Sequence, residues 1–277
     1  MTRPPPQPAR AVQTVLITGG SRGIGLAMAR AFGMAGAKVL LLARSAPALE
    51  DAAAALAAEG IPAWWQAADV TDPASVAAAV SAAIGTHGHI DVLVNNAGRG
   101  AQHLWLHQPP EQARQEMETN YFGTLNLLRA VLPHMIARGA GVVLNVSSVC
   151  GMVATPSMAG YSASKAAVNL LVHSLRGELA GTGVRLCVFV PGHTATDLGH
   201  ASRFDRVPMN SPAHVARQAV QAARAGRPEW FASKGDHMLW RVARLSPRLG
   251  EWLMAGTTRA VMLDLAATGS PASPSSV

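Results

Sequence analysis

The chain is poor in cysteine and contains no hydrophobic run of the length that a membrane-spanning helix needs. Its 277 residues include two cysteines, Cys150 and Cys187, so a framework of several disulfide bonds is excluded and we expect both thiols to be free. The segment from Met1 to Arg10 is rich in proline and lacks the apolar core of a secretory signal. These absences predict a soluble, cytoplasmic protein.

Patterns typical of metal or nucleic-acid binding are also missing. Of the ten histidines, His103 and His107 are four residues apart, but no set of cysteines or carboxylates accompanies them at ligand spacing. Most of the net charge of +7 lies between Arg203 and Arg259, where ten basic and four acidic residues occur. These basic residues are not interleaved with aromatic stacking platforms and form no recognised nucleic-acid motif. We therefore expect no metal site and no nucleic-acid partner.

Tyrosine and lysine are scarce too, with two and three copies, yet one of each stands four residues apart. Tyr161 and Lys165 begin a segment with helical spacing of apolar residues, and positions i and i+4 share one face of a helix. A nearby ammonium group stabilises a phenolate. We therefore expect Lys165 to lower the pKa of Tyr161 toward neutral pH, where a phenol can exchange protons with a substrate. Alone, the pair also fits an exposed tyrosine and lysine on a helix.

Two further polar residues precede this pair. Ser148 closes the mainly apolar run 141–148, which is typical of a buried parallel strand, and open α/β sheets bind ligands at the carboxyl ends of such strands. Asn120 lies upstream in a helical pattern. Each residue alone fits a helix cap or a turn, whereas together with Tyr161 and Lys165 they form a candidate catalytic set.

A glycine-rich segment follows the first apolar run of the chain. Residues 14–18 have the composition of a strand, residues 19–25 contain four glycines, and residues 26–35 have a helical pattern. Glycine permits close backbone approach and the free N–H groups at a helix start attract anions, so this turn can hold a phosphate. A plain tight turn is the alternative. The next apolar run, 38–43, completes a β-α-β unit and favours nucleotide binding.

These motifs resemble those of the short-chain dehydrogenase/reductase family, over residues 11–225. The resemblance implies a Rossmann fold and a nicotinamide cofactor held by the glycine loop, by the ends of the second, third and fourth strands, and by the segment after the sixth strand. The cofactor-binding residues that it implies are Gly19, Ser21, Arg22, Gly23, Ile24, Gly25, Arg44, Asp69, Val70, Asn95, Ala97, Gly98, Tyr161, Lys165, Pro191, Gly192, Thr194 and Thr196.

The resemblance also implies a catalytic tetrad and a role for each member. Tyr161 would be the general acid in carbonyl reduction and the base in alcohol oxidation. Lys165 would lower the pKa of Tyr161 and bind the ribose of the nicotinamide half. Ser148 would hydrogen-bond the substrate oxygen, and Asn120, through its backbone carbonyl and a water molecule, would connect Lys165 to solvent. The hydride itself belongs to the cofactor.

The choice between NADP(H) and NAD(H) depends on the end of the second strand. Enzymes that use NAD place an acidic residue there, which binds the ribose 2′-hydroxyl and repels a 2′-phosphate. This chain has Ala43 at that position, with Arg44 next to it and Arg22 in the glycine loop. Two guanidinium groups suit a dianionic phosphate, so we expect NADP(H) rather than NAD(H). The alternative is that both arginines are merely solvated.

The order of the segments predicts the fold class. Apolar runs alternate with helical segments at intervals of roughly 25–30 residues, as in a doubly wound parallel α/β sheet. We expect one domain over residues 11–265, a disordered arm at 1–10 and a disordered tail at 266–277. The expected strands lie near 14–18, 38–43, 63–67, 91–95, 141–147, 185–190 and 229–232.

Two regions point to partners. The expected helices within 110–138 and 161–180 carry more apolar residues than one face against a sheet needs, and family members pair through these helices, so we expect a homodimer or homotetramer. Residues 228–255 form an amphipathic C-terminal extension that contains three of the six tryptophans and recurrent arginines. Three interpretations of it remain open: a lid over a hydrophobic pocket, a subunit interface, or peripheral contact with a membrane surface.

The substrate is expected to be a small carbonyl or alcohol compound with an apolar skeleton. The candidate pocket segments are 100–106, 152–158 and 193–209, of which the first two supply Trp105, Met152, Val153 and Met158. Fold and cofactor motifs do not choose among such compounds. Two other functions remain possible: a nucleotide sensor that keeps the fold without catalysis, and an epimerase or dehydratase that keeps the tetrad.

Overall fold

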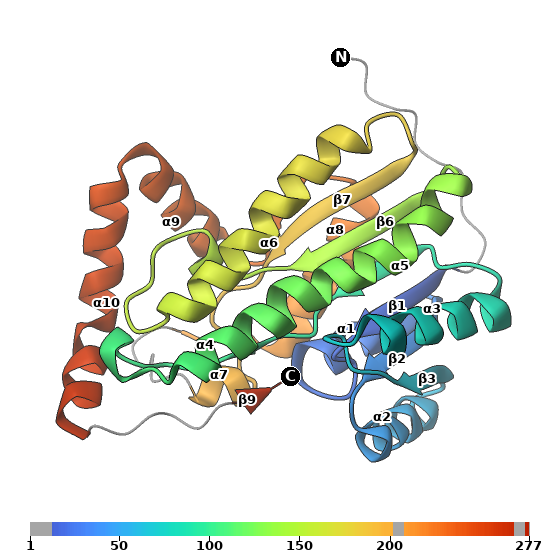
Figure 1. The fold of residues 1–277 in the computed structure, drawn as a ribbon, viewed down its shortest axis with the longest axis horizontal. Coiled ribbons are helices and arrows are strands. Elements are labelled where there is room, and N and C mark those ends of the chain that lie inside the picture. Colours follow the sequence, from blue (N-terminus) through green and yellow to red (C-terminus); the bar gives the residue numbers. More distant parts are fainter. Residues whose placement is uncertain (1–12, 202–207, 269–274, 277) are drawn as a thin grey trace.

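A parallel sheet of seven strands forms the centre of the molecule (Figure 1). The computed structural model describes residues 13–201, 208–268 and 275–276. The strand order is β3-β2-β1-β4-β6-β7-β8, and every neighbouring pair in it is parallel. The strands are β1 (Thr14–Thr18), β2 (Lys38–Ala43), β3 (Ala63–Ala67), β4 (Val92–Asn95), β6 (Gly141–Val146), β7 (Val184–Val190) and β8 (Glu229–Phe231).

Helices cover both faces of this sheet because successive strand residues point to opposite sides. In β1, Val15 and Ile17 enter the core beneath one set of helices, whereas Leu16 enters the core on the other face. The helices on the first face are α1 (Gly23–Met34), α2 (Ala46–Ala58) and α8 (Pro212–Ala225). Those on the second are α3 (Pro73–His87), α5 (Gly123–Ala137) and α6 (Ala159–Glu178).

The doubly wound α/β fold predicted from the sequence is confirmed. Each of the seven expected strands is present, with its ends within one residue of the expected ones. The remaining elements are short or lie at the periphery: β5 (Arg99–Gly100), a 3-10 turn at Trp105–His107, α4 (Pro110–Met117), a π-helical turn at Glu118–Phe122, a 3-10 turn at Val149–Gly151, α7 (Asp197–Ala201) and β9 (Ser275–Ser276).

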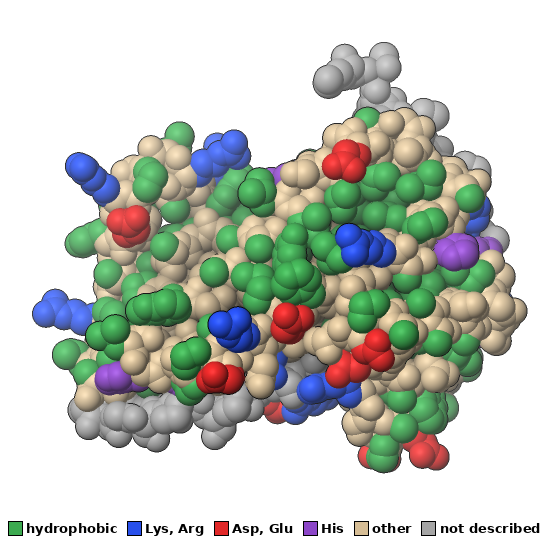
Figure 2. All heavy atoms as spheres, viewed as in Figure 1, with side chains coloured by type: hydrophobic (Ala, Val, Ile, Leu, Met, Phe, Trp, Pro, Cys, Tyr) green, Lys and Arg blue, Asp and Glu red, His purple; other side chains and the backbone are tan. Residues whose placement is uncertain are grey.

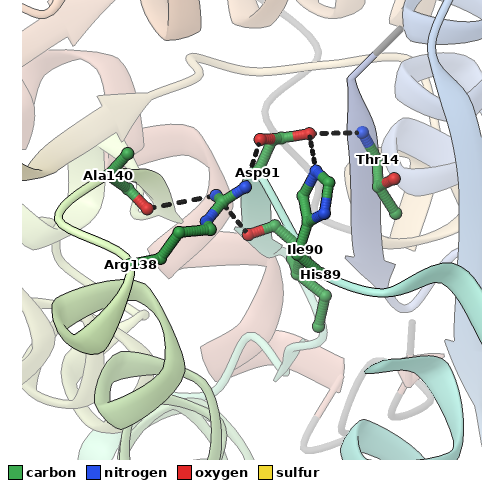
Figure 3. Close-up of polar contacts among 6 residues, drawn as sticks. All are labelled: Thr14, His89, Ile90, Asp91, Arg138 and Ala140. Carbon is green, nitrogen blue, oxygen red and sulfur yellow. Dashed lines mark hydrogen bonds and ion pairs between the residues drawn. The ribbon is translucent and has the colours of Figure 1, made fainter. Parts of the chain in front are cut away.

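A buried ion pair ties together the amino ends of three strands, opposite to the end where the glycine loop lies (Figure 3). Asp91, just before β4, accepts hydrogen bonds from the Thr14 amide (2.9 Å) and from Arg138 (2.9 Å), and His89 lies 3.3 Å away. Arg138 also donates to the carbonyls of Ile90 and Ala140. Burial of Asp91 would raise the pKa of its carboxyl, but these donors outweigh that effect and the pKa lies below its ordinary value.

The C-terminal extension is a pair of helices beside the sheet, α9 (Lys234–Leu245) and α10 (Pro247–Thr268) (Figure 1). Helix α9 is joined to β8 by a stack in which the ring of Phe231 lies 4.8 Å from His237 and 5.2 Å from Trp240. Residues 266–268 of the expected tail complete α10, and Ser275–Ser276 pair with β5. The expected arm at 1–10 and the rest of the tail lie outside the described residues. Within the described ranges, no helix combines the length and apolarity needed to cross a membrane.

Candidate active site

The glycine loop is a tight turn between β1 and α1 that only small residues can form. Gly19 and Gly23 have positive φ angles of 64° and 57°, which favour glycine. A Cβ atom added to Gly25 would overlap the Gly19 carbonyl oxygen. At the glycine positions no side chain blocks the backbone. The backbone of the loop and the free N–H groups at the start of α1 therefore form a cradle that fits a phosphate group of a dinucleotide.

Side-chain hydrogen bonds fasten this loop to the end of β4. The hydroxyl of Thr18 accepts from the amides of Asn96 (3.0 Å) and Ala97 (2.9 Å), and Asn96 Nδ2 donates to the Thr18 carbonyl (3.0 Å). Asn95, which the sequence marked as a cofactor contact, points into the sheet and donates to Asn145 Oδ1 of β6 (3.0 Å). Asn96, which the sequence analysis left out, lines the cavity and bonds to the loop. The alternation of side chains along a strand places it, and not Asn95, against the loop.

Ser148, Tyr161 and Lys165 line one cavity of about 210 Å³ at the carboxyl ends of the central strands. Ser148 follows β6, and Tyr161 and Lys165 occupy the first two turns of α6. All three side chains belong to buried residues. Gly98 also lines the cavity, and its lack of a side chain leaves space beside the Lys165 ammonium. The structure therefore brings together three members of the tetrad expected from the sequence.

A hydrogen bond to the backbone holds the Lys165 side chain beside the tyrosine. Its Nζ atom donates to the Val146 carbonyl (2.9 Å), and Nζ lies 5.8 Å from the centre of the Tyr161 ring. Burial lowers the pKa of Lys165 to about 8, since a low-dielectric environment disfavours the charged form. The ammonium is therefore close to losing its proton under mildly alkaline conditions.

The pKa of Tyr161 differs from the expectation. Burial raises it above the ordinary value of a phenol, the neighbouring Cys150 and Glu116 groups act in the same direction, and a hydrogen bond with Ser148 opposes them. Lys165 was expected to lower this pKa, but desolvation dominates the shift and Lys165 is not among the groups that cause it. Tyr161 consequently keeps its proton at neutral pH, a state that suits a proton donor.

Asn120 lies on the π-helical turn between α4 and α5, a distortion that often marks functional sites. Its side chain accepts from the Arg99 amide (2.8 Å) and donates to the Arg99 carbonyl (2.8 Å) and to Ser164 (2.8 Å). Its backbone carbonyl accepts from the Thr124 hydroxyl (2.8 Å) and retains a second lone pair. The Asn120 side chain thus connects the backbone of Arg99 to Ser164 of α6, next to the cavity. Its role in a proton relay stays a prediction.

Glu116 fixes the loop that passes over the tyrosine. Its carboxylate accepts from the Ala101 amide (2.8 Å) and from Gln108 (3.1 Å), and burial raises its pKa. A Cβ atom added to Gly100 would lie 2.7 Å from the Tyr161 ring, so the loop packs flat against that ring. The sequence analysis missed Glu116 because nothing in the local pattern separates it from other acidic residues on the same helix.

The cofactor residues expected from the sequence follow the carboxyl edge of the sheet. Arg44 follows β2 and is exposed, and Asp69 and Val70 follow β3, with the Asp69 carboxylate accepting from the amide (2.9 Å) and hydroxyl (2.8 Å) of Thr71. The others that line the cavity are Ile24, Pro191, Gly192, Thr194 and Thr196. Both groups of residues therefore lie at the carboxyl edge of the same sheet as Ser148.

Arg22 makes a contact that the sequence did not predict. Its guanidinium forms an ion pair with Asp197 at the start of α7 (2.7 Å), and both side chains are largely exposed. The pair links the glycine loop to the segment after β7. Arg22 is therefore already engaged, whereas Arg44 forms no ion pair with another described residue that would compete with a phosphate.

The substrate side of the cavity differs in part from the expected pocket. Met158 lines it, but Trp105 is exposed on the surface, and Met152 instead accepts a hydrogen bond from Asn169 through its sulfur atom. Residues outside the three candidate pocket segments, but within the extension 228–255, complete the lining from the C-terminal helices: Asp236, Leu239 and Met254. This observation favours the lid interpretation of residues 228–255.

The chain belongs to the short-chain dehydrogenase family. A family model described as short chain dehydrogenase matches residues 13–206, a range that includes the glycine loop and all four tetrad positions. The resemblance stated from the motifs is thereby confirmed. Helix α8, strand β8, the C-terminal helices α9 and α10, and strand β9 lie beyond the match, and α9 and α10 supply part of the cavity lining.

Two relatives share about two thirds of the chain. The protein is 40% identical over 190 residues to oxidoreductase UcpA of Escherichia coli strain K12, an alignment that covers 68% of this chain and 72% of the relative. It is 37% identical over 190 residues to dehydrogenase/reductase SDR family member 7B of Bos taurus, with 66% of this chain and 58% of the relative covered. The match to the bovine protein therefore spans less than two thirds of its length.

Solved structures of other proteins resemble this fold. A gluconate 5-dehydrogenase from Burkholderia cenocepacia in complex with NADP and tartrate has a TM-score of 0.75 at 31% identity, with 82% of this chain and 95% of that chain covered. An F189W actinorhodin polyketide ketoreductase with NADPH has a TM-score of 0.76 at 29% identity, covering 81% and 97%. A short-chain dehydrogenase from Burkholderia phymatum in complex with NAD has a TM-score of 0.79 at 25% identity, covering 86% and 95%.

The lowered pKa of Lys165 predicts a pH-dependent effect of Lys165→Met on stability. Between the unfolded pKa near 10.5 and the folded pKa of about 8, the unfolded wild type binds a proton that the folded protein does not. The wild type therefore loses stability as the pH falls through this window, and the variant does not. The free energy of unfolding of the variant, minus that of the wild type, should rise by up to ~3 kcal/mol from about pH 10 to about pH 7.

Urea unfolding at several pH values measures this difference. Lys234→Met, which removes an exposed lysine, is the matched control and should show a difference that is nearly independent of pH. A constant difference for Lys165→Met would mean that burial does not shift the protonation of Lys165.

Proposed function

We propose that the protein is an NADP(H)-dependent oxidoreductase that transfers hydride between the nicotinamide and a ketone or alcohol with a largely apolar skeleton. The observation that carries this proposal is the convergence of Ser148, Tyr161 and Lys165 on one cavity that Ile24, at the end of the glycine loop, also lines. The family match and the NADP- or NAD-bound structural neighbours support a nicotinamide cofactor.

The side chains divide the chemistry between them. The nicotinamide, when bound, supplies or accepts the hydride. In reduction, Ser148 donates a hydrogen bond to the substrate oxygen and Tyr161, which is protonated at neutral pH, gives its proton to that oxygen. The Lys165 ammonium stabilises the negative charge that Tyr161 then carries. In oxidation the same groups act in reverse, with Tyr161 as the base.

Tyr161→Phe should abolish most of this activity. The change removes the proton donor and keeps the ring that packs against Gly100. We expect NADPH-dependent reduction of a ketone to slow by roughly 10²–10⁴-fold, the usual contribution of general acid catalysis, while NADPH binding is retained. Tyr121→Phe, which alters the only other tyrosine, is the control and should keep its activity. Turnover of Tyr161→Phe near the wild-type rate would show that another group supplies the proton.

Preference for NADP(H) rests on the end of β2. The acidic residue that binds a free ribose hydroxyl in NAD enzymes is replaced by Ala43, and the exposed guanidinium of Arg44 follows. A planar guanidinium forms charge-assisted hydrogen bonds with a phosphate dianion. Arg22 contributes less in this proposal, because Asp197 holds its guanidinium at 2.7 Å.

Arg44→Ala should therefore weaken NADPH binding by roughly 10- to 100-fold and leave NADH binding almost unchanged, since a hydrogen bond to a charged group contributes about 1.5–3 kcal/mol. Arg22→Ala should cause a smaller loss of the same sign. Ala43→Asp should go further by repelling the 2′-phosphate and binding the free ribose hydroxyls. Fluorescence titration of both cofactors measures these effects. Equal losses for NADH and NADPH in Arg44→Ala would assign Arg44 a structural role.

An apolar substrate fits the lining of the cavity. The side chains that face it include Val149, Met158, Leu198, Leu239 and Met254. Apolar side chains exclude water and bind hydrocarbon surface without specific geometry, which is typical of small-molecule sites. Cys150 and His193 also line the cavity, as polar or reactive groups beside the tetrad.

We also propose that the protein forms a homodimer or homotetramer through α5 and α6. Hydrophobic side chains gather over these two helices on the face shown in Figure 2. Leu170 on α6 is 68% exposed, and Phe122 and Ile136 remain partly exposed at 42% and 39%. An exposed leucine on a helix otherwise packed on the core fits a symmetric interface between copies of the chain.

Leu170→Arg should shift the assembly toward the monomer. A charged side chain at the centre of an apolar interface is desolvated without a partner, so association should weaken. Light scattering should give a multiple of 28.8 kDa for the wild type and a mass near 28.8 kDa for the variant. Leu245→Arg alters a more exposed leucine on α9 and should leave the assembly intact. A monomeric wild type would contradict the proposed interface.

A further inference from the structure

Asp236 is an acidic residue in a cavity with a largely apolar lining. It lies in the first turn of α9, which Ser233 caps by accepting from the amides of Gly235 (3.1 Å) and Asp236 (3.3 Å). An acid at this position usually has a local explanation, because its carboxylate can face the capping residue and the positive end of the helix. The cap accounts for the amide of Asp236. It does not account for the carboxylate, because one of its two oxygens has no hydrogen bond within the described residues.

The carboxylate of Asp236 extends over the segment after β7. It packs so closely on Gly192 that a Cβ atom at that position would overlap Oδ2, and hence only glycine leaves room for it. Oδ2 is buried and has no hydrogen-bond partner among the described residues. A buried carboxylate oxygen without a donor is costly, so Oδ2 calls for a donor from outside the described residues.

The groups around Asp236 place it on the substrate side of the cavity. Gly192 and His193 belong to the segment beside the expected nicotinamide position, and Cys150 lies two residues after Ser148. Asp236, Cys150 and His193 line the same cavity, so Asp236 lies beside the residues that flank the reacting groups. Burial raises the pKa of Asp236, and a hydrogen bond with Ser233 and the charge of His193 oppose that effect.

We propose that Asp236 Oδ2 accepts a hydrogen bond from a second polar group of the substrate, a hydroxyl or ammonium donor set apart from the reacting carbonyl. The inference rests on the proposed function and makes it narrower: the preferred substrate is a hydroxyketone or aminoketone, or the corresponding diol or amino alcohol, with an apolar skeleton between the two groups. Leu239 and Met254 contact that skeleton.

The same carboxylate sets what the site rejects. A simple ketone leaves Oδ2 without a donor, and sites built to hydrogen-bond a substrate group discriminate strongly against analogues that lack it. A ketone with a carboxylate in place of the donor adds repulsion between like charges. The order of preference is therefore donor-bearing ketone, parent ketone, carboxylated ketone.

Matched aromatic ketones test this order with NADPH as the reductant. The probes are acetophenone and its analogues with a hydroxymethyl, an aminomethyl or a carboxyl group at the 3′ or 4′ position. For the wild type, kcat/KM for at least one donor-bearing analogue should exceed that of acetophenone by roughly tenfold or more, the range of a hydrogen bond to a charged group. The carboxyl analogues should react more slowly than acetophenone.

Three variants separate recognition from structure. Asp236→Leu removes the acceptor and keeps a similar shape over Gly192, so it should abolish the preference while acetophenone is still reduced. Asp236→Asn keeps an acceptor oxygen without the charge, so it should lose the preference for the ammonium probe more than for the hydroxyl probe. Glu251→Gln removes an exposed acid from α10, and this matched control should retain the wild-type preference.

Binding is measured separately from turnover. Calorimetry on Tyr161→Phe, which keeps the cavity but lacks the proton donor, should show tighter binding of the preferred donor-bearing probe than of acetophenone, and the added Asp236→Leu change should remove that difference. Two results would overturn the inference. One is equal affinity of Tyr161→Phe for the donor-bearing probe and for acetophenone, and the other is a fall in kcat/KM of Asp236→Leu by the same factor for every probe. Selective binding without any turnover by the wild type would support it and refute the proposed function instead.

Discussion

The hydrogen bond from Lys165 Nζ to the Val146 carbonyl joins α6 to the end of β6, and the geometry of the candidate site depends on it. Val146 is two residues before Ser148, and Lys165 is one helical turn after Tyr161. This bond therefore helps to set the positions of the Ser148 hydroxyl, the Tyr161 phenol and the Lys165 ammonium relative to one another. The same burial that orients the ammonium lowers its pKa. The protein thus retains a lysine that weakens the folded state at neutral pH, as expected where function requires a buried charge.

Much of the fold and the core of the site can be predicted from the sequence because both depend on local patterns. A strand buried on both faces has to be apolar along its whole length, and this requirement identifies β1 and its neighbours within one residue. Tyr161 and Lys165 share a helix face, so their spacing alone predicts that they act together. Ser148 follows from its place at a strand end. These predictions use only the spacing at which side chains recur on one face of a helix or strand, and the direction of the strands. They do not require knowledge of contacts between distant segments.

The parts that could not be predicted depend on such distant contacts. The pKa of Tyr161 rises because other segments bury it, and spacing along the chain contains no measure of burial. Arg22 and Asp197 are 175 residues apart in sequence, and no local pattern pairs them. Asp236 resembles an ordinary acid at a helix start until its carboxylate is found over Gly192. The specificity of the site is thus decided by contacts that exist only in the folded protein.

The strand order has a consequence for how the chain emerges from the ribosome. β1 lies at the centre of the sheet, between β2 and β4, but β4 begins at Val92 and is made after both β2 and β3. During synthesis, one edge of β1 therefore keeps its backbone N–H and C=O groups unpaired while its apolar residues Val15 to Ile17 are already in place. Unpaired apolar edges are templates for association between chains. The nascent protein is consequently exposed to aggregation at this edge until β4 has been made, a period in which a chaperone that covers strand edges would protect it.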